Sequence, residues 1–252
     1  MIDTKSLLNT DFSDIKKKFS GLLVDIRKKL IFTILFFVSA TLVGFVFYEG
    51  IISLIIEVLS LSDINIVFTS PFQFINLSIS VGLATGLIVT FPILVIQILL
   101  FLKPALKRKE FRVVTRFLPF SLALFLIGFV FGAFIMKWQI GIFLTRATSI
   151  GIGNVLDISK LLSTIMLTSA LMGIGFQFPI ILILLMRLKV INHKELAKRR
   201  SWIYLGSFIF AILLPADSIL ADVFLSLPLI ILFEIALIIG RINKRANPNT
   251  KN

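Results

Sequence analysis

The sequence predicts an all-α polytopic membrane protein, and three observations carry that prediction. Hydrophobic residues make up 58% of the 252 residues and charged residues only 15%, and the mean hydropathy is +1.03. Soluble proteins are roughly 45–50% apolar and about 25% charged. The basic residues also fall in clusters, separated by uncharged stretches long enough to cross a bilayer. A globule of this size cannot bury so many apolar side chains, so lipid must surround most of it.

The placement of charge limits the classes of function. Of the 26 basic residues, seven, six, six and four lie in 1–30, 103–116, 187–200 and 241–252. A nucleic-acid-binding protein would instead expose Lys and Arg between aromatic side chains on a polar face, so nucleic acid is not expected as a partner. Cysteine is absent and His193 is the only histidine. This excludes disulfides and thiolate metal sites, and we expect no metal and no cofactor.

Six stretches are candidates for transmembrane helices, since crossing the ~30 Å hydrocarbon layer takes about 20 apolar residues. The fifth stretch has only 16 uncharged residues, and the sixth contains Glu234. We therefore expect both to be short and to be joined by a tight turn through Pro215, Ala216 and Asp217. The six predicted spans are 30–48, 71–102, 117–136, 161–186, 201–216 and 223–240.

The orientation follows from the basic clusters, because loops rich in Lys and Arg remain on the cytoplasmic side. With six spans, the amino terminus, the loops at 103–116 and 187–200 and the carboxyl-terminal tail share one side, and these are the four basic clusters. Both termini are therefore predicted to be cytoplasmic. The chain divides into a cytoplasmic segment at 1–29, a membrane domain at 30–240 and a basic tail at 241–252.

Features within and between the spans predict the shape of the bundle. The first 30 residues contain four aspartates and precede a long apolar run, so we expect a retained anchor rather than a cleaved signal. Isoleucines at helical spacing from residue 51 predict a short amphipathic helix in the first outer loop. Prolines inside spans remove backbone donors and should bend the helices into a kinked, cupped bundle. These prolines are Pro92, Pro119, Pro179 and Pro228.

Four polar residues are candidates for functional sites. Two lie within predicted spans, and the other two are single carboxylates in basic segments. Gln177 lies within the fourth span, where its amide needs a partner inside the protein or in a watery recess, for packing or for function. Glu234 lies near the cytoplasmic end of the last span and could pair with Arg241 or a basic loop. Asp25 and Glu110 are each a solitary carboxylate in a basic segment, where a local salt bridge is the ordinary role.

Several short patterns, in order and with matching spacing, make the chain similar to the TatC family of the twin-arginine protein translocase, from about residue 19 to 241. The family's amino-terminal basic pattern resembles 22–30, where Leu22 replaces a histidine. Its last-span pattern of Leu, an aromatic and Glu resembles 232–234. The other matching residues are Phe91, Pro92 and Gln97; Phe101, Pro104, Ala105, Leu106 and Glu110; Gly173, Phe176, Gln177 and Pro179; and Pro215 and Asp217.

The resemblance implies a non-enzymatic receptor and scaffold for exporting folded proteins whose signal peptides carry paired arginines. It implies that Asp25 and Glu110 accept the guanidinium groups, since a carboxylate can bind Arg bidentately and Lys fits less well. Arg27, Phe101 and Pro104 would shape the same cytoplasmic surface. The signal's apolar segment would then slide into the bundle toward Gln177.

The resemblance also implies partners. TatA-type and TatB-type single-span subunits would dock along the last two spans and near Gln177, with Asp217 and Glu234 as further polar contacts, and the chain would self-associate in a larger complex. The two short spans would thin the bilayer locally. The membrane would be a bacterial plasma membrane or an organellar one.

Two other functions remain open from the residues alone. A secondary transporter or permease subunit would show an inverted repeat and charged groups near the midplane, and no repeat is apparent between 30–136 and 161–240. An intramembrane enzyme is disfavoured because the sequence has no HExxH motif, and the single histidine lies in a basic loop. Cargo and copy number are not encoded in any pattern we recognise.

Overall fold

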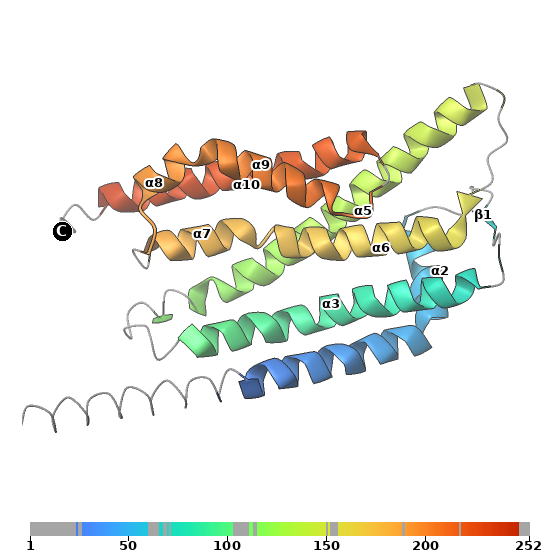
Figure 1. The fold of residues 1–252 in the computed structure, drawn as a ribbon, viewed down its shortest axis with the longest axis horizontal. Helices are drawn as coiled ribbons and strands as arrows, with labels where there is room; N and C mark the ends of the chain where they lie inside the picture. The colour runs from blue at the N-terminus through green and yellow to red at the C-terminus, as the bar shows by residue number, and fades with distance from the viewer. Residues whose placement is uncertain are drawn as a thin grey trace, which may run out of the picture.

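The computed structural model describes residues 24, 27–59, 66–67, 70, 72–102, 111–112, 115–149, 151, 156–187, 190–216 and 218–246. Within these residues the protein is a bundle of long helices (Figure 1). Five helices are long and apolar enough to cross a membrane. The all-α polytopic fold predicted from the composition is confirmed.

The elements follow in chain order. The first helix covers Arg27–Val46. The following elements are α2 (Tyr48–Val58), β1 (Ile66–Val67), α3 (Gln73–Leu102), α5 (Leu118–Ser149), β2 (Leu156–Asp157), α6 (Ile158–Gly175), α7 (Phe178–Arg187), α8 (His193–Lys198), α9 (Arg200–Ile212) and α10 (Ile219–Ala246). The two strands form a short parallel pair, with Ile66 opposite Leu156 and Val67 opposite Asp157.

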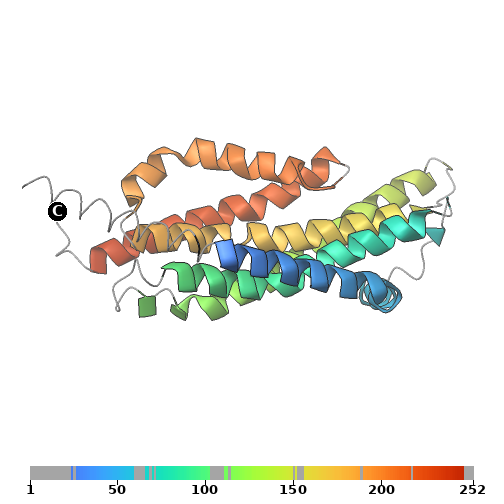
Figure 2. The ribbon, with the colours of Figure 1, turned by 60° about the horizontal axis from the view of Figure 1, so that its bottom comes forward.

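The helices pack in a chain of neighbours. The first helix lies against α3, α3 lies against α6, and α6 lies along α5. At the other side of the bundle, α10 packs against both α7 and α9 (Figures 1 and 2). We call the end where the first helix begins and α3 and α10 finish the basic end, because Arg27, Arg116 and Lys194 are exposed there. The other end, with α2 and the two strands, is the opposite end.

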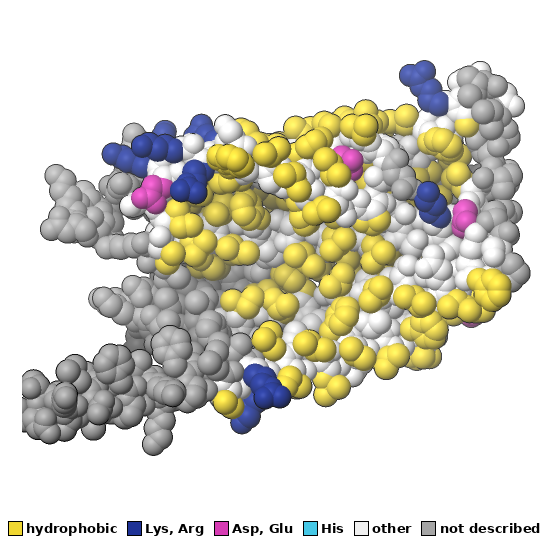
Figure 3. Space-filling view, in the orientation of Figure 1, with side chains coloured by type: hydrophobic (Ala, Val, Ile, Leu, Met, Phe, Trp, Pro, Cys, Tyr) yellow, Lys and Arg dark blue, Asp and Glu magenta, His cyan; other side chains and the backbone are white. Residues whose placement is uncertain are grey.

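Three apolar clusters form the interior. One joins α3 to α6 around Leu77 and Leu162, the second joins α5, α6 and α10 around Met172, and the third joins α7 to α10 around Phe233. Many large apolar side chains remain exposed on the outside of the helices, from Leu35 in the first to Ile238 in the last. Figure 3 shows this hydrophobic surface across the middle of the molecule, with Lys and Arg at its two ends, as expected for a surface solvated by lipid.

The predicted span boundaries were wrong in one place. We expected 137–160 to be an outer loop, but α5 continues to Ser149, because Lys137 and Arg146 lie on its exposed side and long basic side chains can reach water from there. The fourth span, predicted at 161–186, matches the candidate span Ile158–Arg187, which is broken where α6 ends at Gly175 and α7 begins at Phe178. This break precedes Pro179, as the missing proline donor predicts.

The remaining prolines behave differently from one another. Pro92 and Pro228 lie inside α3 and α10, which continue through them. Pro119 is the second residue of α5, so the kink expected there was wrong. Proline is well tolerated in the first helical turn, where the backbone N–H has no partner within the helix.

The short elements complete the architecture. The amphipathic helix expected after residue 50 is α2, and its isoleucines Ile51, Ile52, Ile55 and Ile56 pack against the core between α3 and α6. The predicted fifth span is α9, an apolar helix of 13 residues, which reaches only about 20 Å at 1.5 Å per residue. It is shorter than the ~30 Å hydrocarbon layer, so the count of six spans stays a prediction.

Candidate functional site

The basic end brings together the helix ends that flank the predicted binding residues. Arg27 is exposed in the first turn of the first helix, and Phe101 lies in the last turn of α3. These two helix ends lie side by side (Figure 1). Thr33 donates a hydrogen bond to Gln97 Oε1 and so ties the start of the first helix to the end of α3. Asp25, Pro104, Glu110 and Asp217, and the side chain of Phe101, lie outside the described residues.

Gln177 occupies the break between α6 and α7 and is only 7% exposed. Its backbone N–H donates to Ile174 O, so the Gly173 carbonyl loses the donor that a continuous helix would supply. The Gln177 side chain replaces that donor, with Nε2 at 3.3 Å from Gly173 O. Gln177 therefore satisfies the carbonyl that its own helix break leaves free, and buried polar groups require such partners.

The same amide also connects two helices. Ser121 of α5 donates its hydroxyl to Gln177 Oε1 at 2.6 Å, and Gln177 Nε2 donates to Ser121 O at 3.1 Å. The sequence predicted a partner for Gln177 but did not identify it. Ser121 is buried, and a small hydroxyl side chain in an apolar span was the only signal that could have suggested it.

Glu234 connects α10 to α9. Tyr204 Oη donates to Glu234 Oε1 at 2.6 Å, and Arg200 Nε lies 3.5 Å from the same oxygen. Of the two partners the sequence suggested, Arg241 and a basic loop, the structure has the latter, because Arg200 belongs to the basic cluster at 187–200. The short α9 is thereby fixed to α10 near the basic end by a carboxylate, a phenol and a guanidinium.

Asp222 is a buried acid that the sequence did not single out as a site. It lies in the first turn of α10 and is 7% exposed. Its Oδ1 has no hydrogen-bond partner among the described residues. The amino-terminal end of a helix stabilises a negative charge, which favours this position for a carboxylate. An unpaired buried oxygen is nevertheless costly, so this carboxyl group is a polar feature of the interior that no contact within the described residues explains.

These features define a class: a polytopic helical membrane protein whose spans are joined by buried polar contacts. Among the residues that the structure describes, no group of His, Asp and Glu could hold a metal ion.

Comparison with known proteins gives the family. A family model described as "Sec-independent protein translocase protein (TatC)" matches residues 21–228. The chain is 28% identical over 225 residues to TatCy of Bacillus subtilis, covering 87% of each chain. It is 26% identical to TatC of Aquifex aeolicus, covering 88% of this chain and 93% of that one. A crystal structure titled as the twin arginine translocase receptor TatC in DDM superposes with a TM-score of 0.77 at 26% identity, covering 87% of this chain and 99% of that chain.

The chain belongs to the TatC family of Sec-independent protein translocase proteins. It is a multi-pass membrane subunit of a protein translocase. This membership decides against the small-molecule transporter that the residues alone left open.

Replacing Gln177 with leucine is expected to lower the thermal stability of the purified protein. Leucine cannot donate to Gly173 O or accept from Ser121, and leaving buried groups unsatisfied costs about 1–3 kcal/mol. The midpoint of thermal unfolding in detergent measures the loss. The double variant Ser121→Ala/Gln177→Leu removes the hydroxyl as well and should recover part of it, since removing both partners is less harmful than removing one. A double variant as unstable as the sum of both single variants would contradict a direct bond.

Proposed function

We propose that this subunit is the receptor that binds the twin-arginine signal peptides of folded precursor proteins and scaffolds their export, without enzymatic activity of its own. The observation that carries the proposal is the likeness, over nearly the whole chain, to a solved structure titled as the twin arginine translocase receptor. The basic end faces the cytoplasm and both termini lie there, in keeping with the positive-inside rule.

The binding surface lies at the basic end, where the first helix and α3 meet. Asp25 and Glu110 accept the two guanidinium groups of the signal, and Arg27, Phe101 and Pro104 shape the surface around them. A planar guanidinium presents two parallel N–H donors to a carboxylate, whereas an ammonium presents a point charge. The Thr33–Gln97 bond supports this assignment, because it joins the two helix ends that flank Asp25 and Phe101.

The partners are single-span subunits of the TatA and TatB type, which dock along α9 and α10. Exposed apolar side chains on these two helices, such as Leu205, Ile209 and Leu227, support a helix-binding face. Gln177, Asp217 and Glu234 are the polar contacts proposed for this part of the molecule. The unpaired Oδ1 of Asp222 adds an acceptor that a polar group on a partner helix could satisfy.

The experiment that tests the function compares two signal peptides on the full chain in nanodiscs. One peptide carries the paired arginines, and the other carries lysines at the same two positions. We expect the arginine peptide to bind at least about tenfold more tightly, because a guanidinium donates two parallel hydrogen bonds to one carboxylate, whereas the ammonium of lysine cannot bind in this bidentate way. Equal affinity for the two peptides would show that the chain recognises charge alone and would overturn the proposed receptor function.

A further inference from the structure

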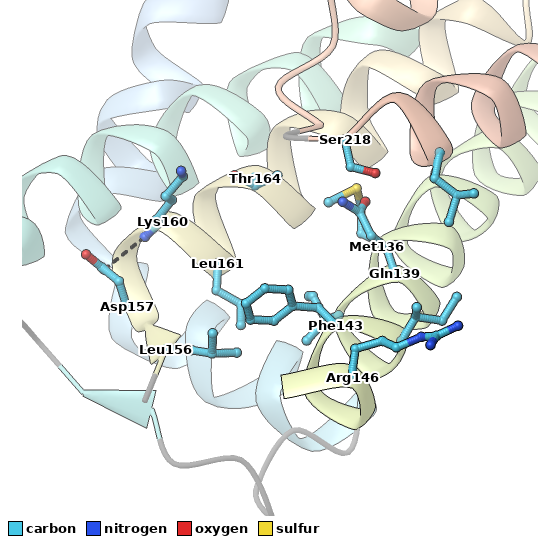
Figure 4. A pocket seen from close by; sticks show the side chains of 13 residues that line it. Met136, Gln139, Phe143, Arg146, Leu156, Asp157, Lys160, Leu161, Thr164 and Ser218 are labelled. Atoms are coloured by element: carbon cyan, nitrogen blue, oxygen red, sulfur yellow. Dashed lines mark hydrogen bonds between the residues drawn. The ribbon is translucent and has the colours of Figure 1, made fainter. Parts of the chain in front are cut away.

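The carboxyl-terminal part of α5 carries two hollows side by side at the opposite end of the bundle. The first, of about 550 Å³, lies between α5, the start of α6 and the segment that leads into α10. In Figure 4, Phe143 of α5 and Leu161 of α6 point toward each other across it, and Ser218 lies at its far side. The second, of about 660 Å³, runs along α5 beside Gly141, Trp138 and Thr145. Both volumes are typical of sites for small ligands.

The two hollows share Arg146 and Ile142, which line both of them. Arg146 is exposed, and no carboxylate of the described residues forms a salt bridge with it. Lys160 lines the first hollow and Lys137 the second. Figure 4 places Lys160 and Arg146 on different sides of the first hollow, with apolar side chains between them. An exposed guanidinium between two apolar hollows is suited to binding an anion that carries apolar chains.

Among the described residues that line the hollows, the one acid already has a structural role. Asp157 Oδ1 accepts from the backbone N–H of Lys160 at 3.1 Å and caps the start of α6. Its Oδ2 accepts from Gln73 Nε2 at 2.5 Å. Both oxygens therefore accept hydrogen bonds from the protein, and the carboxylate keeps its negative charge. Among the described lining residues, three basic side chains outnumber this one carboxylate, so the net charge of these lining residues is positive.

The geometry points to a binding site for one diacyl phospholipid with an anionic headgroup. The phosphate binds Arg146, whose planar fork of donors matches phosphate oxygens, and one acyl chain lies in each hollow. A single cation shared by two separate apolar hollows fits one phosphate that carries two chains. A transmembrane helix of a partner would need one continuous groove.

The position of the site agrees with a lipid headgroup. α5 has 32 residues, about 48 Å at 1.5 Å per residue, which exceeds the ~30 Å hydrocarbon layer. We place its last turns, with Arg146, at headgroup depth, because charged side chains avoid the hydrocarbon layer. Trp138 of α5 packs edge-on against Phe224 of α10, with ring centroids 4.7 Å apart, and tryptophan is enriched at the membrane interface. The site does not depend on the proposed receptor function, because it lies at the end remote from the predicted arginine-binding surface.

Native mass spectrometry of the full chain in mild detergent tests the site, with dioleoyl phosphatidylglycerol and dioleoyl phosphatidylcholine as probes. We expect a first phosphatidylglycerol to bind in preference to phosphatidylcholine. Arg146→Gln should weaken that first binding about tenfold, since hydrogen bonds to charged groups are among the strong ones. Arg116→Gln removes the same charge at the basic end and should leave binding unchanged. Equal weakening by both variants would show a general charge effect and overturn the site.

A second variant tests the acyl chains without changing the charge. A Cβ added to Gly141 would meet no atom within 4 Å, so Gly141→Leu fits the fold and fills the second hollow. It should weaken the diacyl lipid several-fold and affect a single-chain lysophosphatidylglycerol much less. Equal loss of the two lipids, or no loss of either, would contradict one chain in each hollow. Displacement of the lipid by millimolar inorganic phosphate would mean that the site binds free anions instead.

Discussion

Gly132→Leu is expected to destabilise the protein strongly, because it separates α5 from α6. A Cβ at residue 132 would lie 2.8 Å from the Cα of Ser169 and 3.2 Å from the Cβ of Met172. Backbone cannot move aside as the end of a flexible side chain can. Small residues permit such close approach between membrane helices, whose association depends on van der Waals packing.

The size of the effect follows from overpacking, which costs typically 1–3 kcal/mol, occasionally more. In a chain of this length that corresponds to a fall of about 2–12 °C in the midpoint of thermal unfolding, measured by the loss of the monodisperse peak in size-exclusion chromatography after heating. The matched control is Gly141→Leu, nine residues along the same helix in open space, which should unfold near the wild-type temperature. Equal midpoints for the two variants would mean that the helices separate at Gly132 without cost.

The spans themselves were predictable because the bilayer imposes a length on any apolar stretch. The prediction failed where a charge was taken to end a helix. Lys137 and Arg146 are compatible with α5 because they lie on its exposed side, and a basic residue there extends the helix beyond the hydrocarbon layer rather than ending it. Hydropathy along one chain does not reveal which side of a helix faces water. The end of the third span was therefore predicted too early.

The sequence indicated that buried polar residues need partners, but it did not identify those partners. A buried amide in a span must find a partner, which the sequence indicated for Gln177, but the identity of Ser121 depends on α5 lying beside α6 at that height. The same holds for Arg200 and Tyr204 at Glu234, since α9 and α10 had to be placed before either partner could be named. The parallel pairing of β1 with β2 joins segments 90 residues apart, and two-residue strands carry no periodic signal. Asp25 and Glu110 lie outside the described residues, so their role stays a prediction.

Neutralising Asp25 and Glu110 together, as Asp25→Asn/Glu110→Gln, is expected to abolish capture of a twin-arginine precursor. Each amide keeps the size of the side chain but loses the negative charge that pairs with a guanidinium, and hydrogen bonds to charged groups contribute about 1.5–3 kcal/mol. Each single variant should therefore bind about tenfold more weakly or worse, and the double variant should show no specific binding. Site-specific photocrosslinking of a radiolabelled precursor to membrane vesicles measures the capture.

Two controls separate recognition from folding and from general electrostatics. Glu195→Gln removes an exposed carboxylate from α8, at the same basic end of the bundle, and should leave crosslinking unchanged. Asp25→Glu keeps the charge and adds one methylene, so it should retain capture, because both side chains can bind a guanidinium bidentately. Undiminished crosslinking of the double variant, at wild-type protein level, would remove both acids from the binding surface. If Glu195→Gln weakened crosslinking as much as Glu110→Gln, the basic end would attract precursors through its overall charge. A specific site would instead respond to the loss of one carboxylate and not to the loss of another at the same end of the molecule.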